Sequence, residues 1–369
     1  MKKMIFTAAM MLASAAAMAQ SGTFQIKGNV EGLPDSLVAM IGRKTENIDV
    51  KKKKFEFSKN FDKPQWVYLC DQKVIKSGAF SAIPVFAIPS ETIEMKGNFT
   101  GGVDIKGGKF YQEQDLMNEY KGQAYKDIKA LWKWYSDNVN DSNRDSIEKV
   151  VDERMEPLQK KYAADLLAYA KQHSDQECIA LLIDELDDVK DKETLISLMA
   201  DNVKNGRMKA YYEPIFERAK KRAEMEEKAK VVQASGVEAP DFTLNDINGK
   251  PFSLSSLRGK YVVIDFWGSW CIWCIKGMPK MKEYYEKYKG KFEILGVDCN
   301  DTEAKWKAAV EKHQLPWIHV YNPKGSDVLD KYAVQGFPTK IVIGPDGKIV
   351  KTIVGEDPAF YTLLDEVLK

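Results

Sequence analysis

Histidine and cysteine are scarce in this chain, which contains three histidines and five cysteines among its 369 residues. Only Cys271 and Cys274 stand close together, and neither a second cysteine pair nor a histidine cluster accompanies them. A tetrahedral zinc site therefore lacks ligands. Five scattered cysteines are also too few for the disulfide scaffold of a small secreted protein. We expect no metal and no cofactor.

Net charge is also nearly absent, because the chain carries a formal charge of +1 at pH 7. A near-neutral chain gives no electrostatic argument for binding nucleic acid, so we do not expect that partner. Partners have to be inferred from individual sites instead.

The first 19 residues have the pattern of a secretory signal peptide. Two lysines precede an apolar stretch over 4–17, and Ala17-Met18-Ala19 provides a cleavage site of small residues. Gln20 follows, where a lipoprotein would have a cysteine. We expect cleavage after Ala19 and a periplasmic or cell-envelope location. A permanent transmembrane anchor is the weaker alternative.

Two regions of different pattern follow the leader. Residues 20–110 contain short runs of β-forming residues between turn residues, which predicts an antiparallel β-sandwich-like domain. Apolar residues in 111–232 recur at helical spacing, which predicts a central α-helical region. Cys70, Cys178 and the aromatic cluster at Trp132 are expected in the cores. The clearest strand runs are Phe24–Lys27, Phe55–Phe57, Trp66–Leu69 and Thr92–Met95.

Strand-like and helical segments alternate in residues 236–369, which predicts a mixed sheet with helices on both faces. A hairpin is expected over 242–254, where Asn248-Gly249 suits a type I′ turn. The whole chain is therefore expected to be a multidomain α+β protein.

Cys271 and Cys274 stand where the apolar run 261–264 gives way to a helical pattern. A strand that ends there and opens a helix places Cys271 near the helix N-terminus, where unpaired N–H groups and the helix dipole stabilise negative charge. Such a site lowers the pKa of a thiol and favours the reactive thiolate. Cys274 follows one turn later and is placed to form a disulfide with Cys271. The pair is predicted to be a reversible redox switch.

The surroundings of this pair resemble the TlpA/ResA type of thioredoxin-like proteins, over residues 236–369. An extra helix and strand over 302–321 indicate this subgroup rather than plain thioredoxin. The resemblance implies a C-terminal thioredoxin-like α/β domain and a thiol-disulfide oxidoreductase. The residues that carry it are Phe266-Trp267, Trp270-Cys271-Ile272-Trp273-Cys274, Pro279 and Gly336-Phe337-Pro338-Thr339.

The β-rich region resembles the all-β domain of unknown function that precedes such domains in exported bacterial proteins. This resemblance rests on Lys27-Gly28-Asn29-Val30, Phe55-Glu56-Phe57 and Pro64-Gln65. It implies no particular ligand.

The TlpA/ResA resemblance implies a role for each residue of the site. Cys271 is the exposed nucleophile, and Cys274 resolves the mixed disulfide. Asp265 stands where thioredoxin has its buried acid, although many members of the exported branch have a non-acidic residue there. A carboxylate desolvated at this position would have a raised pKa and could accept the Cys274 proton. An ordinary exposed aspartate at the strand end is the alternative for Asp265. Pro338 is the cis-proline that faces the cysteines, and Pro279 would kink their helix. The residues expected to bind substrate are Trp270, Trp273, Phe337 and Pro338.

Two positions depart from the family pattern. Ile272-Trp273 lies between the cysteines in place of proline or small polar residues, and Gly277 stands where relatives such as ResA often have glutamate. Because both positions bear on the tuning of the thiols, the sequence does not fix the reduction potential or the substrate preference.

We expect an exported thiol-disulfide oxidoreductase that acts as a reductase. A membrane thiol donor of the DsbD/CcdA type would supply electrons, and disulfide-containing exported proteins would be the substrates, with apocytochrome c as one candidate. A thiol peroxidase is disfavoured because Gly268 stands where such a site needs threonine. The non-catalytic alternative is a redox-sensing or ligand-binding envelope protein that uses residues 20–235.

Cys299 follows a predicted central strand at the same sheet edge as Cys271. It could exchange with the pair, but a small buried residue at a strand end is the favoured interpretation. His313 and His319 are expected as ordinary helix-end and strand residues.

Overall fold

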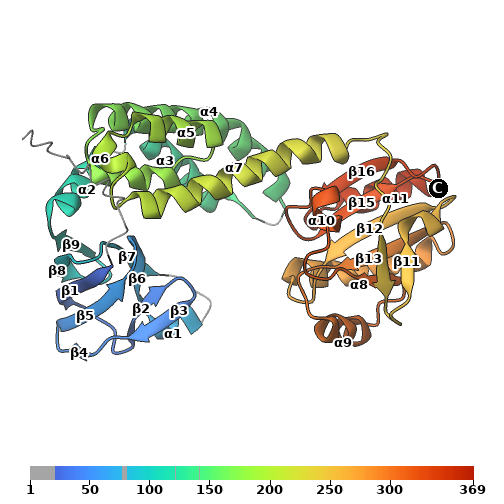
Figure 1. Ribbon diagram of the computed structural model, residues 1–369, viewed down its shortest axis with the longest axis horizontal. Coiled ribbons are helices and arrows are strands. Elements are labelled where there is room, and N and C mark those ends of the chain that lie inside the picture. The colour runs from blue at the N-terminus through green and yellow to red at the C-terminus, as the bar shows by residue number, and fades with distance from the viewer. Residues whose placement is uncertain (1–20, 77–80, 121, 141) are drawn as a thin grey trace, which may run out of the picture. The chain divides into compact units, whose positions relative to one another are not determined.

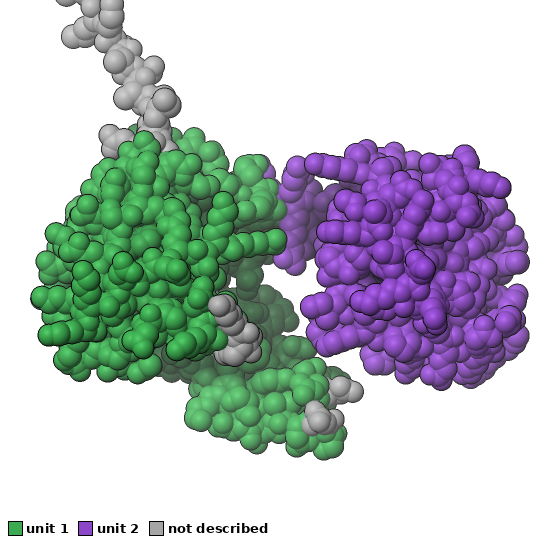
Figure 2. Space-filling model, turned by 90° about the horizontal axis from the view of Figure 1, so that it is seen from below, with its two compact units in different colours: residues 1–219 green, residues 220–369 purple. Residues whose placement is uncertain are grey.

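The computed structural model describes residues 21–76, 81–120, 122–140 and 142–369. The predicted signal peptide and its cleavage site lie outside the described residues. No helix of the described residues is both long and apolar enough to cross a membrane. The chain forms two compact units, residues 1–219 and 220–369 (Figure 2).

The strands of the first unit form two sheets, with the orders β4-β5-β1-β8-β9 and β3-β2-β6-β7 (Figure 1). Neighbouring strands are antiparallel, as predicted, except that β1 and β8 run parallel with Gln25 opposite Thr92. A long connection between these two strands permits the parallel pairing, which the sequence pattern does not reveal. The strands are β1 (Gly22–Glu31), β2 (Leu37–Ile41), β3 (Lys44–Asn47), β4 (Val50–Lys51), β5 (Lys54–Phe61), β6 (Gln65–Asp71), β7 (Ala82–Ala87), β8 (Thr92–Asn98) and β9 (Gly102–Lys106), with helix α1 (Gln72–Lys76) after β6.

Alternation along β1 shows why this region folds as a sandwich. Phe24, Ile26 and Val30 are buried in the core, whereas Lys27 between them is exposed. Side chains of a strand point alternately to its two faces, so this pattern gives β1 one apolar face. Cys70, on β6, is fully buried, as expected.

Helices make up the remainder of the first unit. They include α2 (Lys109–Tyr120), α3 (Gly122–Asn138), α4 (Arg144–Gln172), a 3-10 helix (Glu177–Asp184), α5 (Val189–Leu198), α6 (Asp201–Lys204) and α7 (Lys209–Val232). Trp66 of β6 donates its indole N–H to the Tyr211 hydroxyl at 3.0 Å, which joins a sheet to α7. Cys178 is buried, as predicted. Trp132 is 52% exposed, contrary to prediction, because the adjacent Leu131 faces the core and successive helical residues point about 100° apart.

The second unit is built on a seven-stranded sheet with the order β11-β10-β14-β13-β12-β15-β16 (Figure 1). The central pairs β12–β13 and β13–β14 are parallel, and the outer pairs are antiparallel. The strands are β10 (Thr243–Asp246), β11 (Pro251–Ser253), β12 (Tyr261–Trp267), β13 (Phe292–Asp298), β14 (Ile318–Tyr321), β15 (Thr339–Ile343) and β16 (Ile349–Val354). The mixed sheet predicted from the alternating segments is confirmed.

Helices cover both faces of this sheet, also as predicted. Side chains from α8 (Ile272–Lys287), α9 (Glu303–His313) and α11 (Ala359–Val367) share one apolar core. The short helices on the other core are α10 (Val328–Lys331) and a 3-10 helix (Leu254–Leu257). The boundary between the two units falls inside α7, at residue 220.

The predicted hairpin between β10 and β11 is present, but its turn is not type I′. That turn needs positive φ at two successive residues, and here Gly249 has φ +78° while Asn248 does not have a positive φ. Asp246 stabilises a longer loop instead, because its Oδ1 accepts hydrogen bonds from the N–H groups of Asn248 and Lys250, both at 2.8 Å.

Candidate active site

Cys271 and Cys274 form a disulfide at the start of α8, with Cα atoms 5.3 Å apart. Cys271 is the N-cap residue of the helix, and its Sγ accepts a hydrogen bond from the Cys274 N–H at 3.2 Å. The predicted position at a helix N-terminus is therefore confirmed. A thiolate on Cys271 would gain from this N–H and from the positive end of the helix dipole.

Both cysteines are shielded from solvent. Cys271 is 5% exposed and Cys274 is 4% exposed, and they share a core with Trp267 and Met278. The prediction of an exposed Cys271 is wrong for this disulfide form, because its sulfur is bonded toward the first turn of α8. A partner must therefore reach Cys271 past the side chains beside it.

An exposed apolar rim, formed by Trp270, Ile272 and Trp273, lies beside the disulfide. These side chains are 50%, 67% and 61% exposed. The indole N–H of Trp270 donates to the Cys299 carbonyl at 2.9 Å, and its ring meets that of Phe337 edge-on at 5.4 Å. The rim is thus partly fixed in place while its apolar surface remains accessible.

The loop that carries Phe337 and Pro338 lies next to the rim. The peptide bond between these two residues is cis, as the family resemblance implied. The Pro338 carbonyl accepts a hydrogen bond from the Gly355 N–H at 2.8 Å, and the Thr339 hydroxyl donates to the Gly336 carbonyl at 2.8 Å. These bonds anchor the loop on both sides of Pro338.

Pro279 lies inside α8 and is exposed, and the helix continues beyond it to Lys287. The kink expected at this proline stays a prediction.

Asp265 is buried in β12 and is 5% exposed, so the alternative of an exposed strand-end aspartate is wrong. Its neighbours Val263 and Trp267 belong to the core that contains both cysteines, and alternation along the strand turns Asp265 toward that same face. Burial is the main reason that its pKa rises to about 6; nearby Lys340 lowers the pKa and Glu356 raises it. The predicted raised pKa is thus supported by the environment.

Two charged partners of Asp265 were not predicted. Lys340, on β15 directly opposite Asp265, is 1% exposed, and its Nζ lies 2.9 Å from Glu356 Oε2 and 4.0 Å from Asp265 Oδ1. Tyr361 donates its hydroxyl to Glu356 Oε1 at 2.9 Å. The sequence contains one signal of this arrangement, the single lysine within the apolar run Thr339–Ile343. A lysine buried in such a strand needs a charged partner, so it indicates a buried ion pair.

Cys299 is fully buried, and its Sγ donates a hydrogen bond to the Val297 carbonyl at 3.3 Å. Burial is the main reason that its pKa is raised, which disfavours the thiolate. Cys299 is a free thiol in this disulfide form, and its surroundings fit the favoured interpretation of a small residue at a strand end.

The histidines of this unit lie at a helix end and on a strand, as predicted. His319 is buried in β14, where desolvation lowers its pKa to about 3, and His313 ends α9. Among the described residues, no three His, Cys, Asp or Glu side chains gather in a way that could hold a metal.

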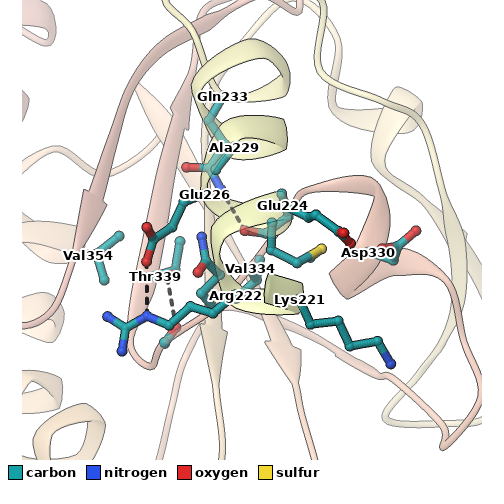
Figure 3. Close-up of a pocket in the computed structure, with 14 residues that line it drawn as sticks. Lys221, Arg222, Glu224, Glu226, Ala229, Gln233, Asp330, Val334, Thr339 and Val354 are labelled. Carbon is teal, nitrogen blue, oxygen red and sulfur yellow. Dashed lines mark hydrogen bonds and ion pairs between the residues drawn. The ribbon is translucent and has the colours of Figure 1, made fainter. Parts of the chain in front are cut away.

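A groove of about 860 Å³ lies within the second unit, beyond the cis-proline loop (Figure 3). The C-terminal part of α7 forms one wall, and an ion pair between Arg222 and Glu226, at 2.9 Å, lies along it. Gly336 and Thr339, which flank Phe337 and Pro338, line the other side. Neither cysteine lines the groove, so this hollow and the redox pair are separate features.

Comparisons with known proteins show what the second unit is similar to. Residues 235–352 match the AhpC/TSA family. The chain is 43% identical over 122 residues to the thiol-disulfide oxidoreductase ResA of Bacillus cereus, a match that covers 33% of this chain and 70% of that protein. It is 36% identical over 123 residues to the ResA protein of Bacillus subtilis, covering 33% of this chain and 68% of that protein. A solved structure, the thioredoxin domain of a thiol-disulfide oxidoreductase from Bacteroides vulgatus, is 35% identical, with a TM-score of 0.35, and the match covers 37% of this chain and 99% of that one.

Proposed function

This chain belongs to the ResA family of thiol-disulfide oxidoreductases, and on that premise we propose that it is an exported reductase of protein disulfides. The observation that carries the proposal is the Cys271–Cys274 disulfide at a helix N-terminus, beside an exposed apolar rim. The proposed location is the periplasm or cell envelope, where a thiol donor of the DsbD/CcdA type would return electrons.

The apolar rim supports a polypeptide as the substrate. Its three side chains, Trp270, Ile272 and Trp273, are all at least half exposed. Large apolar side chains grouped on a surface usually mark an interaction site. Both cysteines are themselves buried, so a substrate disulfide has to be brought to them by contacts with the residues around. Phe337 and Pro338 extend the proposed contact surface. Apocytochrome c is one candidate of this kind.

The proposed reaction moves two electrons from the reduced cysteine pair to the substrate. The Cys271 thiolate attacks one sulfur of the substrate disulfide, and the other sulfur leaves as a thiolate, which takes up a proton. Cys274 then loses its proton to Asp265 and attacks Cys271 Sγ in the mixed disulfide. This second step releases the remaining substrate thiolate and forms the Cys271–Cys274 disulfide. The donor restores both thiols.

The helix terminus is the main support for the Cys271 thiolate. Ile272 and Trp273 add no charge between the cysteines, so the Cys274 N–H and the dipole of α8 have to stabilise the anion. Together these effects favour Cys271 over Cys274 as the attacking thiol.

A trapping experiment tests the proposed function. In Cys274→Ser the mixed disulfide with Cys271 cannot be resolved, so disulfide-linked complexes with exported proteins should accumulate in a cell-envelope extract. Non-reducing gels followed by mass spectrometry would identify the linked proteins. Cys271→Ser/Cys274→Ser is the matched control and should trap nothing. An empty Cys274→Ser trap would overturn the reductase proposal.

The apolar rim gives a second expected result. Trp273→Ala should raise KM for a protein disulfide about tenfold, because an exposed aromatic anchor of an interface typically contributes more than 1 kcal/mol. The rate with a small aromatic disulfide should stay unchanged, since such a substrate needs no extended contact. Lys280→Ala, at an exposed position of the same helix whose ammonium contacts Tyr361 and not the rim, serves as the control. Equal losses with both substrates would show that Trp273 supports the disulfide rather than the partner.

A further inference from the structure

Lys340 is a fully buried cation between two carboxylates. It is 1% exposed, and its Nζ lies 2.9 Å from Glu356 Oε2 but 4.0 Å from Asp265 Oδ1. Placing an ammonium in the core is unfavourable unless charged partners compensate for the lost water. The pairing is unequal, because the short contact goes to Glu356.

Glu356 lies against the helix that carries the cysteines. A Cβ atom at Gly277 would come within 2.3 Å of Glu356 Oε2, closer than two such atoms can approach. Gly277 is on α8, three residues after Cys274, so the Glu356 carboxylate fills the space that a side chain at Gly277 would occupy. The Glu356 side chain is 19% exposed, and Tyr361 donates a hydrogen bond to its Oε1.

The hydrogen bonds divide the two carboxylates into different roles. Glu356 is held by Lys340 and by Tyr361, whereas Asp265 Oδ1 has no hydrogen-bond partner among the described residues. Two carboxylates and one ammonium leave one excess negative charge in the core, which favours the uptake of one proton. That proton belongs on Asp265, because Glu356 is the better-stabilised anion.

The other titratable groups around Asp265 stay uncharged. Cys274 on α8 shares its face of the sheet, and Tyr361 on α11 and Cys299 after β13 lie within its electrostatic reach. Burial raises the pKa of both Tyr361 and Cys299, so neither ionises near neutral pH. Asp298, buried on the neighbouring strand β13, has its pKa raised to about 8, mainly by burial, so it is mostly protonated at pH 7. Lys280 on α8 is exposed and stacks its ammonium over the Tyr361 ring at 4.7 Å. The charges next to Asp265 are therefore those of Lys340 and Glu356.

We propose that Lys340 and Glu356 are positioning residues for thiol exchange: their ion pair holds the ammonium away from Asp265, which leaves Asp265 free to take the Cys274 proton. This inference rests on the proposed role of Asp265. The proton leaves the Cys274 thiol, is held on a carboxyl oxygen of Asp265, and passes to the departing substrate thiolate. No electrons move through the ion pair.

The two partners should shift the pH dependence in opposite directions. Glu356→Gln frees Lys340 to pair with Asp265, so the carboxylate should persist to lower pH. Lys340→Met removes the cation that lowers the pKa of Asp265, so Asp265 should stay protonated to higher pH. Each shift is expected to be about one pH unit or more, because a charge at this distance in the core has that effect. A merely structural role would slow the reaction without moving its pH midpoint in opposite directions.

The reaction of the reduced full-length protein with Ellman's reagent provides the test. Cys271 forms the mixed disulfide and releases one thionitrobenzoate, and the attack by Cys274 releases the second, whose rate is followed by stopped flow from pH 4 to 9. We expect the acidic limb of this second rate to move to lower pH in Glu356→Gln and to higher pH in Lys340→Met. Lys280→Met, which removes a cation next to Tyr361 but not next to Asp265, should leave the limb in place.

The Asp265→Asn variant separates the two levels of the proposal. If it replaces the limb set by Asp265 with a rise only toward the pKa of Cys274, while Glu356→Gln leaves the limb where it is, the positioning role is overturned and the role of Asp265 stands. If Asp265→Asn itself leaves the limb unchanged, the role of Asp265 is overturned. If circular dichroism shows that Lys340→Met does not fold, the test rests on Glu356→Gln alone. An acidic limb that moves to higher pH in Glu356→Gln, or does not move, contradicts the inference.

Discussion

Replacing Cys271 with alanine should reduce the turnover of protein disulfides by ~10³-fold or more, because the residue supplies the nucleophile that begins each cycle. The remaining Cys274 is 4% exposed and lies within the first turn of α8, where it cannot replace an attacking thiol at the N-cap. The rate of reduction of a protein disulfide, with a thiol donor present, measures this loss.

Cys299→Ala is the matched control for this variant. Cys299 is a buried thiol of the same unit, and alanine has a similar volume, so the fold should be preserved. Full turnover in Cys299→Ala alongside its loss in Cys271→Ala would assign the chemistry to the pair at α8. A large loss in Cys299→Ala would show that the third thiol takes part. Absence of turnover in the unchanged protein would favour the sensing or ligand-binding alternative.

Replacing Asp265 with asparagine should slow the resolution step ~10²-fold at pH 7, which is the lower end of what a positioned proton acceptor contributes. With a pKa of about 6, Asp265 is mostly a carboxylate at pH 7 and can accept the Cys274 proton. Asparagine cannot accept it, so the rate should recover only as the pH approaches the pKa of Cys274 itself. Single-turnover release of the second product thiol measures this step.

The same variant should be more stable than the unchanged protein at neutral pH. The pKa of Asp265 is about 6 in the folded state against 3.8 for an unperturbed carboxyl, so the folded state binds the proton more tightly. Wild-type stability should therefore fall as the pH rises from about 4 to 6 and then stay level. Asparagine avoids that loss, which amounts to about 3 kcal/mol at 1.36 kcal/mol per pKa unit. Denaturant unfolding of the oxidised proteins at pH 4 and pH 7.5 measures the difference.

The resolution rate and the free energy of unfolding of Asp265→Asn test different properties of the same carboxyl group. A gain in stability without a slower resolution step would confirm that Asp265 is a buried acid and reject its role in proton transfer. If the wild-type protein had the same free energy of unfolding at pH 4 and pH 7.5, Asp265 would ionise in the core without destabilising the fold.

The elements around the redox pair follow from local signals in the sequence. Adjacent residues are enough to predict the strand before Cys271, the helix after it and the strand at Thr339. In such segments the spacing of apolar residues indicates which side chains are buried. The burial of Asp265 was predictable for the same reason, since Ile264 and Phe266 beside it are apolar.

Features that depend on contacts between distant segments were not predictable in this way. The ion pair of Lys340 and Glu356 forms only because β15 and β16 pair, and the parallel contact of β1 with β8 joins opposite ends of the β-rich region. The low exposure of Cys271 depends on the direction of its bond to Cys274. None of these arrangements leaves a periodic signal in the residues concerned.

Gly277 and Glu356 compete for the same volume beside the cysteine helix. Relatives of the TlpA/ResA type often have glutamate at the first of these positions, whereas this chain has glycine there and glutamate at the second. A negative charge can thus reach the same place from either of two points in the chain. Across the family, the two positions should covary: a long acidic side chain at one requires a small residue at the other.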